Sequence, residues 1–161
     1  MRTVYKVLAY LVAAEVAIQA LVVVWAVFGL FKWVDGGGVL DKAVIEGIIF
    51  GGASPFTEVL GITMHGINGV LVVPLLALLL LIVSFFTKVR GATKWAVIVF
   101  ALVVVQVMLG ILGHWVTLGG ALHGLNALAL FGTAIYAGRR LRAVTAAAVE
   151  QPEARTATPV S

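Results

Sequence analysis

A short polar motif occurs twice in an otherwise apolar chain. The segment MHGING at 64–69 recurs as LHGLNA at 122–127. Imidazole nitrogens are common ligands of first-row metals, so His65 and His123 are candidate metal ligands. A histidine inside an apolar segment also serves as a hydrogen-bonding contact between helices. The repetition of the motif favours a paired role over two unrelated packing contacts.

A glutamine on the preceding apolar segment accompanies each motif. Gln19 comes before His65 and Gln106 before His123, so both halves of the chain have the same order of polar residues. This order indicates an internal duplication.

The two asparagines of the motifs stand three residues after their histidines, on the same face of a helix. Asn68 and Asn126 could orient the imidazoles or pair with Gln106 and Gln19. They could equally serve only to hold helices together.

Four apolar segments must position these side chains. Of the 161 residues, 62% are hydrophobic and 11% are charged, which is too apolar for a soluble domain of this length. Each segment has the roughly 20 residues that cross a bilayer core. They cover residues 4–31, 59–86, 95–115 and 119–137 approximately. We predict an all-α integral membrane four-helix bundle, made of two parallel helical-hairpin repeats, in one domain over residues 1–142.

Basic residues predict the orientation of this bundle. They gather at both chain ends and between the second and third segments: Arg2, Lys6, Lys88, Arg90, Lys94, Arg139, Arg140 and Arg142. On the other side, two lysines are outnumbered by four acids: Lys32, Lys42, Asp35, Asp41, Glu46 and Glu58. The positive-inside rule therefore predicts a multi-pass protein of the bacterial plasma membrane with both termini in the cytoplasm. The net charge of +4 is accounted for by topology and does not indicate a nucleic-acid partner.

The first outer loop, 32–57, is much longer than the second, which covers about 114–118. It contains the turn signals GGG and GGASP. Between them, residues 39–50 have apolar side chains near helical spacing, which predicts a short amphipathic helix across the outer face. The tail, 143–161, is rich in Ala, Thr, Pro and Glu, and we predict that it is disordered.

The two histidines are expected at matched depth. Both lie a few residues inside the outer ends of their helices, within roughly 10 Å of the outer boundary. Imidazoles from two opposed helices bind one haem iron from both sides of a porphyrin, and Gly66 and Gly124 leave room for its plane. We predict one b-type haem per chain, with His65 and His123 as axial ligands. Zinc or copper would require more ligands, and His114, the one further histidine, has no repeat partner.

One carboxylate falls deep inside a predicted span. Glu15 stands four residues before Gln19 on one helix face, and Leu102 replaces it in the second repeat. A carboxylate in a bilayer is energetically expensive and is a candidate functional group. We expect a protonated Glu15, below the level of the histidines and hydrogen-bonded within the bundle. It could serve a proton or quinone site, or only packing.

The segment VQVMLGIL at 105–112, followed by LHGLNA at 122–127, resembles the heme A synthase family. Its members carry a Gln-x-x-Leu-Gly run before a ligand histidine, in two four-helix halves with long first outer loops. About 130 residues of this chain resemble one half, which implies haem ligation by His65 and His123. The glutamate and loop cysteines of the catalytic half are missing, with Ile62 in the glutamate position and Gly66 in place of the usual arginine. The resemblance therefore implies the non-catalytic, haem-holding half; the chain also resembles small bacterial four-helix membrane proteins.

These features predict a membrane b-type cytochrome for electron transfer or haem carriage. Its partners would be the bilayer and a redox or oxidase-assembly protein, and no catalytic residue is predicted. Two other functions fit the sequence. One is an accessory or assembly subunit without haem, and the other is a small transporter or quinone-site protein centred on Glu15. The absence of cysteine excludes disulfides, thiolate metal sites and iron–sulfur clusters.

Overall fold

The computed structural model describes residues 1–50 and 55–156, with side chains described up to residue 140, and this part of the chain is all helical. Its elements are α1 (Arg2–Asp35), α2 (Lys42–Phe50), η1 (Thr57–Val59), α3 (Leu60–Ile67), η2 (Asn68–Val72), α4 (Val73–Ser84), α5 (Ala92–Gly113) and α6 (Thr117–Thr156). Four helical segments are long and apolar enough to cross a membrane: Arg2–Asp35, Thr57–Ser84, Ala92–Gly113 and Thr117–Arg140. The predicted all-α, four-span architecture is confirmed.

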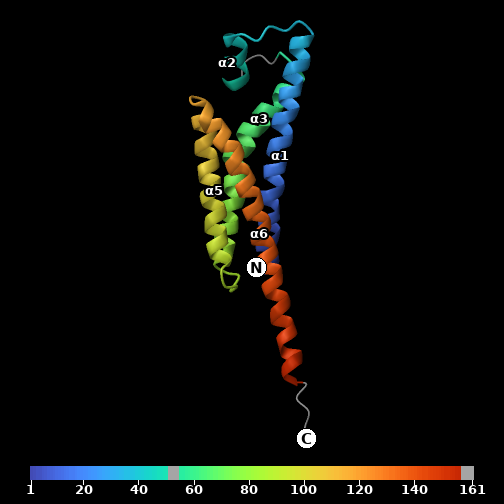
Figure 1. Ribbon diagram of the computed structural model, residues 1–161, viewed down its shortest axis with the longest axis vertical. Coiled ribbons are helices and arrows are strands. Elements are labelled where there is room, and N and C mark those ends of the chain that lie inside the picture. Colours follow the sequence, from blue (N-terminus) through green and yellow to red (C-terminus); the bar gives the residue numbers. More distant parts are fainter. Residues whose placement is uncertain (51–54, 157–161) are drawn as a thin grey trace.

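Successive spans run in opposite directions (Figure 1). The first hairpin consists of α1 and the span from η1 to α4, and the second consists of α5 and α6. We call the end of the bundle that carries α2 the α2 end, and the opposite end, where α1 begins, the terminal end. α6 runs past the bundle in the terminal direction (Figure 1), so the start of α1 and the end of α6 lie on the same side.

α1 has 34 residues and is therefore about 50 Å long at 1.5 Å per residue. This exceeds the bilayer core of about 30 Å, so α1 must tilt or extend beyond it. The helix ends at glycines: the N–H of Gly36 bonds to the carbonyl of Lys32, and Gly37 has a φ of 97°. Glycine adopts this left-handed conformation without steric cost.

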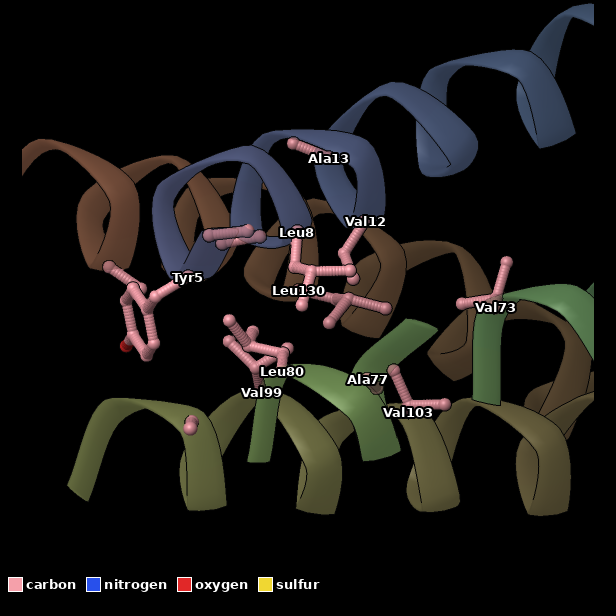
Figure 2. Packing of buried hydrophobic residues seen from close by; sticks show 14 of the residues in the cluster. Tyr5, Leu8, Val12, Ala13, Val73, Ala77, Leu80, Val99, Val103 and Leu130 are labelled. Atoms are coloured by element: carbon pink, nitrogen blue, oxygen red, sulfur yellow. The ribbon is translucent and has the colours of Figure 1, made fainter. Parts of the chain in front are cut away.

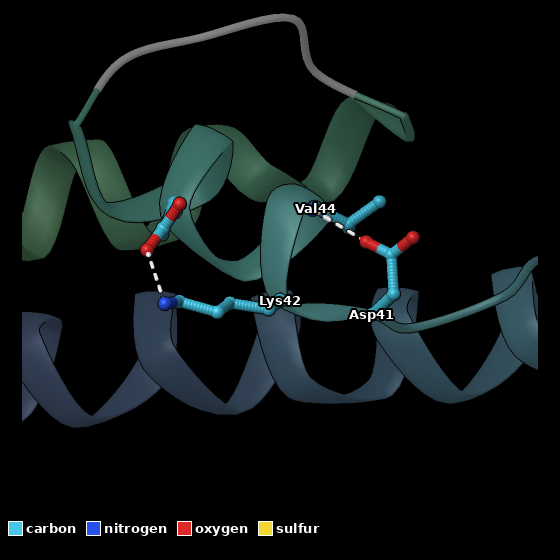
Figure 3. Close-up of polar contacts among 4 residues, drawn as sticks. Asp41, Lys42 and Val44 are labelled. Atoms are coloured by element: carbon cyan, nitrogen blue, oxygen red, sulfur yellow. Dashed lines mark hydrogen bonds and ion pairs between the residues drawn. The ribbon is translucent and has the colours of Figure 1, made fainter.

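α2 begins at a side-chain cap (Figure 3). The N–H of Val44 donates to Oδ1 of Asp41 at 2.9 Å, which satisfies one of the free N–H groups of the first turn. Lys42 and Glu46, one turn apart, form an exposed ion pair at 3.6 Å. α2 packs against α3, and the short helix expected within residues 39–50 is present.

The second span is irregular at its middle. Asn68–Val72 form a π-turn, in which the N–H of Val73 bonds to the carbonyl of Asn68, five residues back. Pro74 follows at once; it has no N–H, and its ring displaces the carbonyl four residues before it. A π-turn is a common way to accommodate such an interruption. Beyond the turn, α3 leans toward α1 (Figure 1).

All four spans meet in the half of the bundle nearest the terminal end (Figure 2). Each span contributes a fully buried alanine, at 0% exposure: Ala9, Ala77, Ala96 and Ala134. Small side chains allow helix backbones to approach closely, which is a principal source of packing energy within a membrane. The hydroxyl of Tyr5 donates to the carbonyl of Ala92 at 3.0 Å and joins the beginnings of α1 and α5.

The outgoing helices of the two hairpins, α1 and α5, have matching buried positions. Three buried residues of α1 have buried counterparts 87 positions later, the interval that also relates Gln19 to Gln106. The matching pairs are Tyr5 and Ala92, Ala9 and Ala96, and Val12 and Val99. The duplication seen in the polar motifs thus extends to the core.

The second spans of the two hairpins also have matching positions, but the interval between matching residues changes by one along the span. His65 and His123 are 58 positions apart, whereas the buried Ala77 and Ala134 are 57 apart. The π-turn between His65 and Ala77 accounts for the difference, because it holds one residue more than an α-helical turn.

Toward the α2 end, the hairpins no longer share a core. A Cβ at Gly61 would overlap the carbonyl oxygen of Val22, so α3 packs closely on α1. α5 and α6 pack on one another at Gly113 and Gly119. Both histidines lie at this level, and their side chains are half-buried.

α6 extends further than the sequence predicts. The tail from residue 143 is predicted to be disordered, but the helix continues to Thr156. Alanine has the highest helix propensity, and an alanine run follows the last span. Residues 157–161 of that predicted tail lie outside the described residues.

The four-span arrangement predicts that the loop before α2 and the start of α5 lie on opposite sides of the membrane. A cysteine at Val39, which is 73% exposed, should react with an impermeant thiol reagent from outside the cell. A cysteine at Thr93, between α4 and the body of α5, should react only after the membrane is permeabilised. The chain has no native cysteine to interfere. Reaction of both positions from one side would contradict the four-span topology.

Candidate functional site

His65 of α3 and His123 of α6 lie next to each other, edge to face, across the two hairpins. Their ring centroids are 6.0 Å apart, with the ring planes at 66°, and both side chains are half-buried. Two imidazoles on opposite sides of one metal ion, with metal–nitrogen bonds of about 2.0 Å, would have centroids about 6 Å apart. The pair predicted from the repeated motif is thus brought to a separation that suits shared ligation.

In the second hairpin, Gln106 holds the imidazole of His123 at both nitrogens. Nδ1 of His123 donates to the carbonyl of Gln106 at 2.9 Å, and the Gln106 carboxamide nitrogen donates to Nε2 at 3.1 Å. Nδ1 therefore carries the proton, and Nε2 presents its lone pair. Asn126 donates to Oε1 of Gln106 at 2.7 Å and to the carbonyl of Leu102 at 2.9 Å, which fixes the carboxamide.

Gly110 of α5 provides the surface on which His123 rests. A Cβ at this position would lie 3.2 Å from both Cε1 and Nδ1 of the imidazole. Any larger residue would push the ring away from Gln106.

In the first hairpin, the Gln19 carboxamide inserts beside the backbone of the second span. Its hydrogen-bonding neighbours assign the nitrogen toward His65, donating to Nδ1 at 2.6 Å and to the backbone carbonyl at 3.1 Å. Its oxygen accepts from Nδ2 of Asn68 at 2.9 Å and from the N–H of Gly69 at 3.2 Å. Gln19 thereby bonds to backbone groups immediately before and at the π-turn.

Glu15, one turn before Gln19 on α1, also belongs to this network. Nδ2 of Asn68 donates to Oε2 of Glu15 at 2.6 Å, so the partner of the carboxyl group is Asn68 and not Gln19. In the second hairpin the corresponding Asn126 bonds to the backbone of Leu102. In both networks a glutamine joins a histidine to an asparagine, but Gln19 bonds to Nδ1 of His65 and Gln106 to Nε2 of His123, and only the first network contains a carboxyl group.

The other candidate residues lie apart from these networks. Gly66 and Gly124 are exposed, and a Cβ at either would meet no atom within 4 Å. His114 is exposed at the end of α5, edge-on to Trp115 with ring centroids 5.8 Å apart. The structure thus separates His114 from the pair formed by His65 and His123.

Sequence interpretation missed three parts of the site. The sequence did not identify the contact of Gly110 with His123, the carbonyl of Leu102 as an acceptor, or the π-turn. Only the π-turn has a direct sequence signal, Pro74 six residues after an intramembrane asparagine. The choice of a backbone acceptor leaves no trace in the side-chain sequence.

The donor set constrains the chemistry. Among the described residues, no cluster of three or more His, Asp or Glu side chains is placed to hold a metal ion. A zinc site built by protein side chains needs three or four such ligands. Two opposed imidazoles suit a metal whose other ligands come from a macrocycle.

No family model, curated protein or solved structure matches the chain. The function must therefore be argued from the site itself.

The polar network predicts a measurable contribution to stability. Asn126→Leu removes two hydrogen bonds between α5 and α6 and should lower the free energy of unfolding in detergent by about 0.6–2 kcal/mol. Leu128→Ala, at a 71% exposed position two residues after Asn126, should change it by less than about 0.5 kcal/mol. Equal losses for the two variants would show that Asn126 is not a structural contact.

Proposed function

We propose that the protein is a membrane b-type cytochrome that binds one haem between its hairpins, with His65 and His123 as axial ligands. The observation that carries the proposal is their 6.0 Å centroid separation across the hairpins. A haem iron with two imidazole ligands has no open position for substrate and is suited to electron transfer. Electron transfer or haem carriage is accordingly the proposed task, with a redox or assembly protein as partner.

The backbone carbonyls beside the imidazoles support this assignment. A backbone carbonyl lies near Nδ1 of each ring, that of Gln106 at 2.9 Å from His123 and that of Gln19 at 3.4 Å from His65. Metal-binding histidines usually donate their second N–H to such an acceptor, which orients the ring and increases its basicity.

Ligation requires a local change in each hairpin. In the first, the Gln19 carboxamide that donates to Nδ1 of His65 must turn away, so that Nδ1 can carry the proton and Nε2 can bind iron. In the second, Gln106 donates to Nε2 of His123, the nitrogen that would bind iron. Its carboxamide must rotate away, whereas the bond from Nδ1 to the Gln106 carbonyl remains. The open surface at Gly66 and Gly124 provides room for the plane of a macrocycle.

We propose that the α2 end, and with it the two histidines, faces the outside of a bacterial plasma membrane, because basic residues gather at the terminal end. α2 packs on α3, the helix that carries His65. We propose that α2 covers the porphyrin edge, with Lys32 and Lys42 as cationic neighbours for the propionates.

A second candidate function is a haem-free accessory subunit. The hydrogen bond from Gln106 to Nε2 of His123 favours it, because this bond satisfies the histidine without a metal. The purified protein discriminates between the two functions: a red protein with a sharp reduced α-band supports the cytochrome alone.

The ligand assignment predicts the effect of single substitutions. His65→Ala or His123→Ala should each remove most of the bound haem, because each imidazole supplies one of the two proposed bonds from the protein to iron. The haem-to-protein ratio of the purified variants measures this loss. His114→Ala is the matched control and should retain nearly all haem. Dependence on His114 and independence from His123 would refute the assignment.

The glycines provide a test that leaves the ligands intact. Gly124→Leu should lower haem content by at least about tenfold if the macrocycle lies against this backbone, whereas the fold has space for the side chain. Gly132→Leu, which also meets no atom within 4 Å, should retain haem. Circular dichroism and thermal unfolding check that both variants fold. Full haem content in Gly124→Leu would contradict the proposed position of the macrocycle.

A further inference from the structure

A hollow at the terminal end of the bundle carries positive charge that the proposed haem site does not use. It lies where the loop between α4 and α5 meets α6 and the start of α1 (Figure 1). Arg90 of the loop and Arg140 of α6 both line it, and most of the remaining lining is apolar, including Val89, Trp95 and Ala137. The hollow is shallow, with room for about one water molecule, so a larger ligand would lie at its mouth, beside both guanidinium groups.

The guanidinium of Arg140 is oriented by Tyr136 and uncovered beside Gly91. Nη1 donates to the hydroxyl of Tyr136, one turn earlier on α6, at 3.2 Å. A Cβ at Gly91 would lie 3.5 Å from Nη2 and 3.7 Å from Nε, and the φ of 85° at this position favours glycine. A guanidinium has several N–H donors, and within the described residues Arg140 uses one of them. The others are available to an anion.

Tyr136 and Trp95 place this hollow at the membrane boundary. Their rings pack with centroids 4.5 Å apart, and each residue stands near the end of its span, Ala92–Gly113 or Thr117–Arg140. Tryptophan and tyrosine are enriched where the hydrocarbon core meets the headgroups. In the described part of the chain, the hydroxyl of Tyr136 accepts from Arg140 but has no acceptor for its own hydrogen, so it can donate to the same anion.

No carboxylate neutralises this cluster within residues 1–140. The acids of that range are Glu15, inside the first span, and four residues near the α2 end: Asp35, Asp41, Glu46 and Glu58. Glu150 and Glu153 follow at least ten residues beyond Arg140, about 15 Å along α6. Arg90 and Arg140 therefore repel each other across one hollow, and an anion between them would remove that repulsion.

We propose that Arg90, Arg140 and Tyr136 bind the phosphate group of an anionic phospholipid, with its glycerol and upper acyl chains against Trp95. Basic pockets between transmembrane helices are a common type of site for anionic headgroups. A free phosphate ion would offer the same oxygens. The apolar lining and the position at the membrane boundary favour the lipid, whose glycerol and acyl carbons can contact the apolar side chains. The site lies at the opposite end of the bundle from the histidines and does not depend on haem.

The duplication does not supply a second copy of this site. Tyr136 and Arg140 correspond to Leu79 and Val83, 57 positions earlier, the interval between the buried alanines of the same spans. The first hairpin thus has apolar residues at both positions. We expect one anionic lipid per chain, bound at the second hairpin.

Quenching of Trp95 fluorescence by brominated lipids tests the site. Phenylalanine replaces the other tryptophans, which all lie toward the α2 end: Trp25→Phe, Trp33→Phe and Trp115→Phe. The full chain is reconstituted in phosphatidylcholine vesicles that contain brominated phosphatidylglycerol, or brominated phosphatidylcholine for comparison. Phosphatidylglycerol should reach half-maximal quenching at a membrane fraction at least about tenfold lower, because choline cancels the charge of the phosphate in phosphatidylcholine.

Single substitutions locate the binding site. Arg140→Gln and Arg90→Gln should each reduce the preference for phosphatidylglycerol about fivefold, the contribution of one cation beside an anionic headgroup. Arg139→Gln and Lys88→Gln are the matched controls, because they remove the same charge from exposed neighbouring positions that do not line the hollow. Each should change the preference by less than about twofold. Circular dichroism checks that the variants fold.

Native mass spectrometry of the chain with all its tryptophans gives an independent measure. The unsubstituted chain should retain one phosphatidylglycerol. Arg140→Gln should lose this lipid, whereas Arg139→Gln should keep it.

Three results would overturn the proposal. Equal quenching by the two brominated lipids would show that no anionic headgroup is selected. Equal losses in Arg139→Gln and Arg140→Gln would show diffuse attraction to a negative surface instead of a site. Displacement of the brominated lipid by millimolar inorganic phosphate would assign the arginines to a free anion.

Discussion

The absence of water inside a bilayer is the constraint on which this structure depends. Every polar side chain within a span must find its partner inside the bundle, because an unpaired donor or acceptor in lipid costs several kcal/mol. Gln106 meets this demand with three contacts, to both nitrogens of His123 and to Asn126. Gln19 meets it by reaching the backbone of the facing span. The polar residues therefore fix how the helices of each hairpin face one another.

The bundle divides this task between its two halves. Near the terminal end, alanines and valines pack closely and need no polar contact. Toward the α2 end, the hairpins separate, and hydrogen bonds within each hairpin replace shared apolar packing. A tightly packed half next to a more open, polar half is a suitable frame for a ligand site, since the packed half holds the geometry without the ligand.

Much of this arrangement could be predicted from the sequence. The lengths of the apolar segments predicted the four spans to within a few residues, because crossing a bilayer demands a minimum length. The repeated motif predicted that His65 and His123 would face each other, because duplication implies two-fold placement. The helix within residues 39–50 followed from apolar spacing.

Other features could not be predicted, for identifiable reasons. Periodicity shows which face a residue occupies, but not whether Asn68 reaches Gln19 or Glu15, since both lie on one face of α1. Asn126 bonds to a main-chain carbonyl, and such an acceptor exists at every position whatever the side chain. The continuation of α6 to Thr156 depends on alanine propensity, which the polar composition of the tail obscured.

The π-turn has a consequence for the direction in which His65 points. One residue added to a regular helix rotates everything beyond it by about 100°. The first hairpin has one residue more than the second between its histidine and its buried alanine, which in a regular helix would turn His65 toward lipid. Local overwidening at Asn68–Val72 absorbs that rotation. Whether the two imidazoles face each other thus depends on the rotation of α3 about its own axis. The wider turn at Asn68–Val72 sets that rotation.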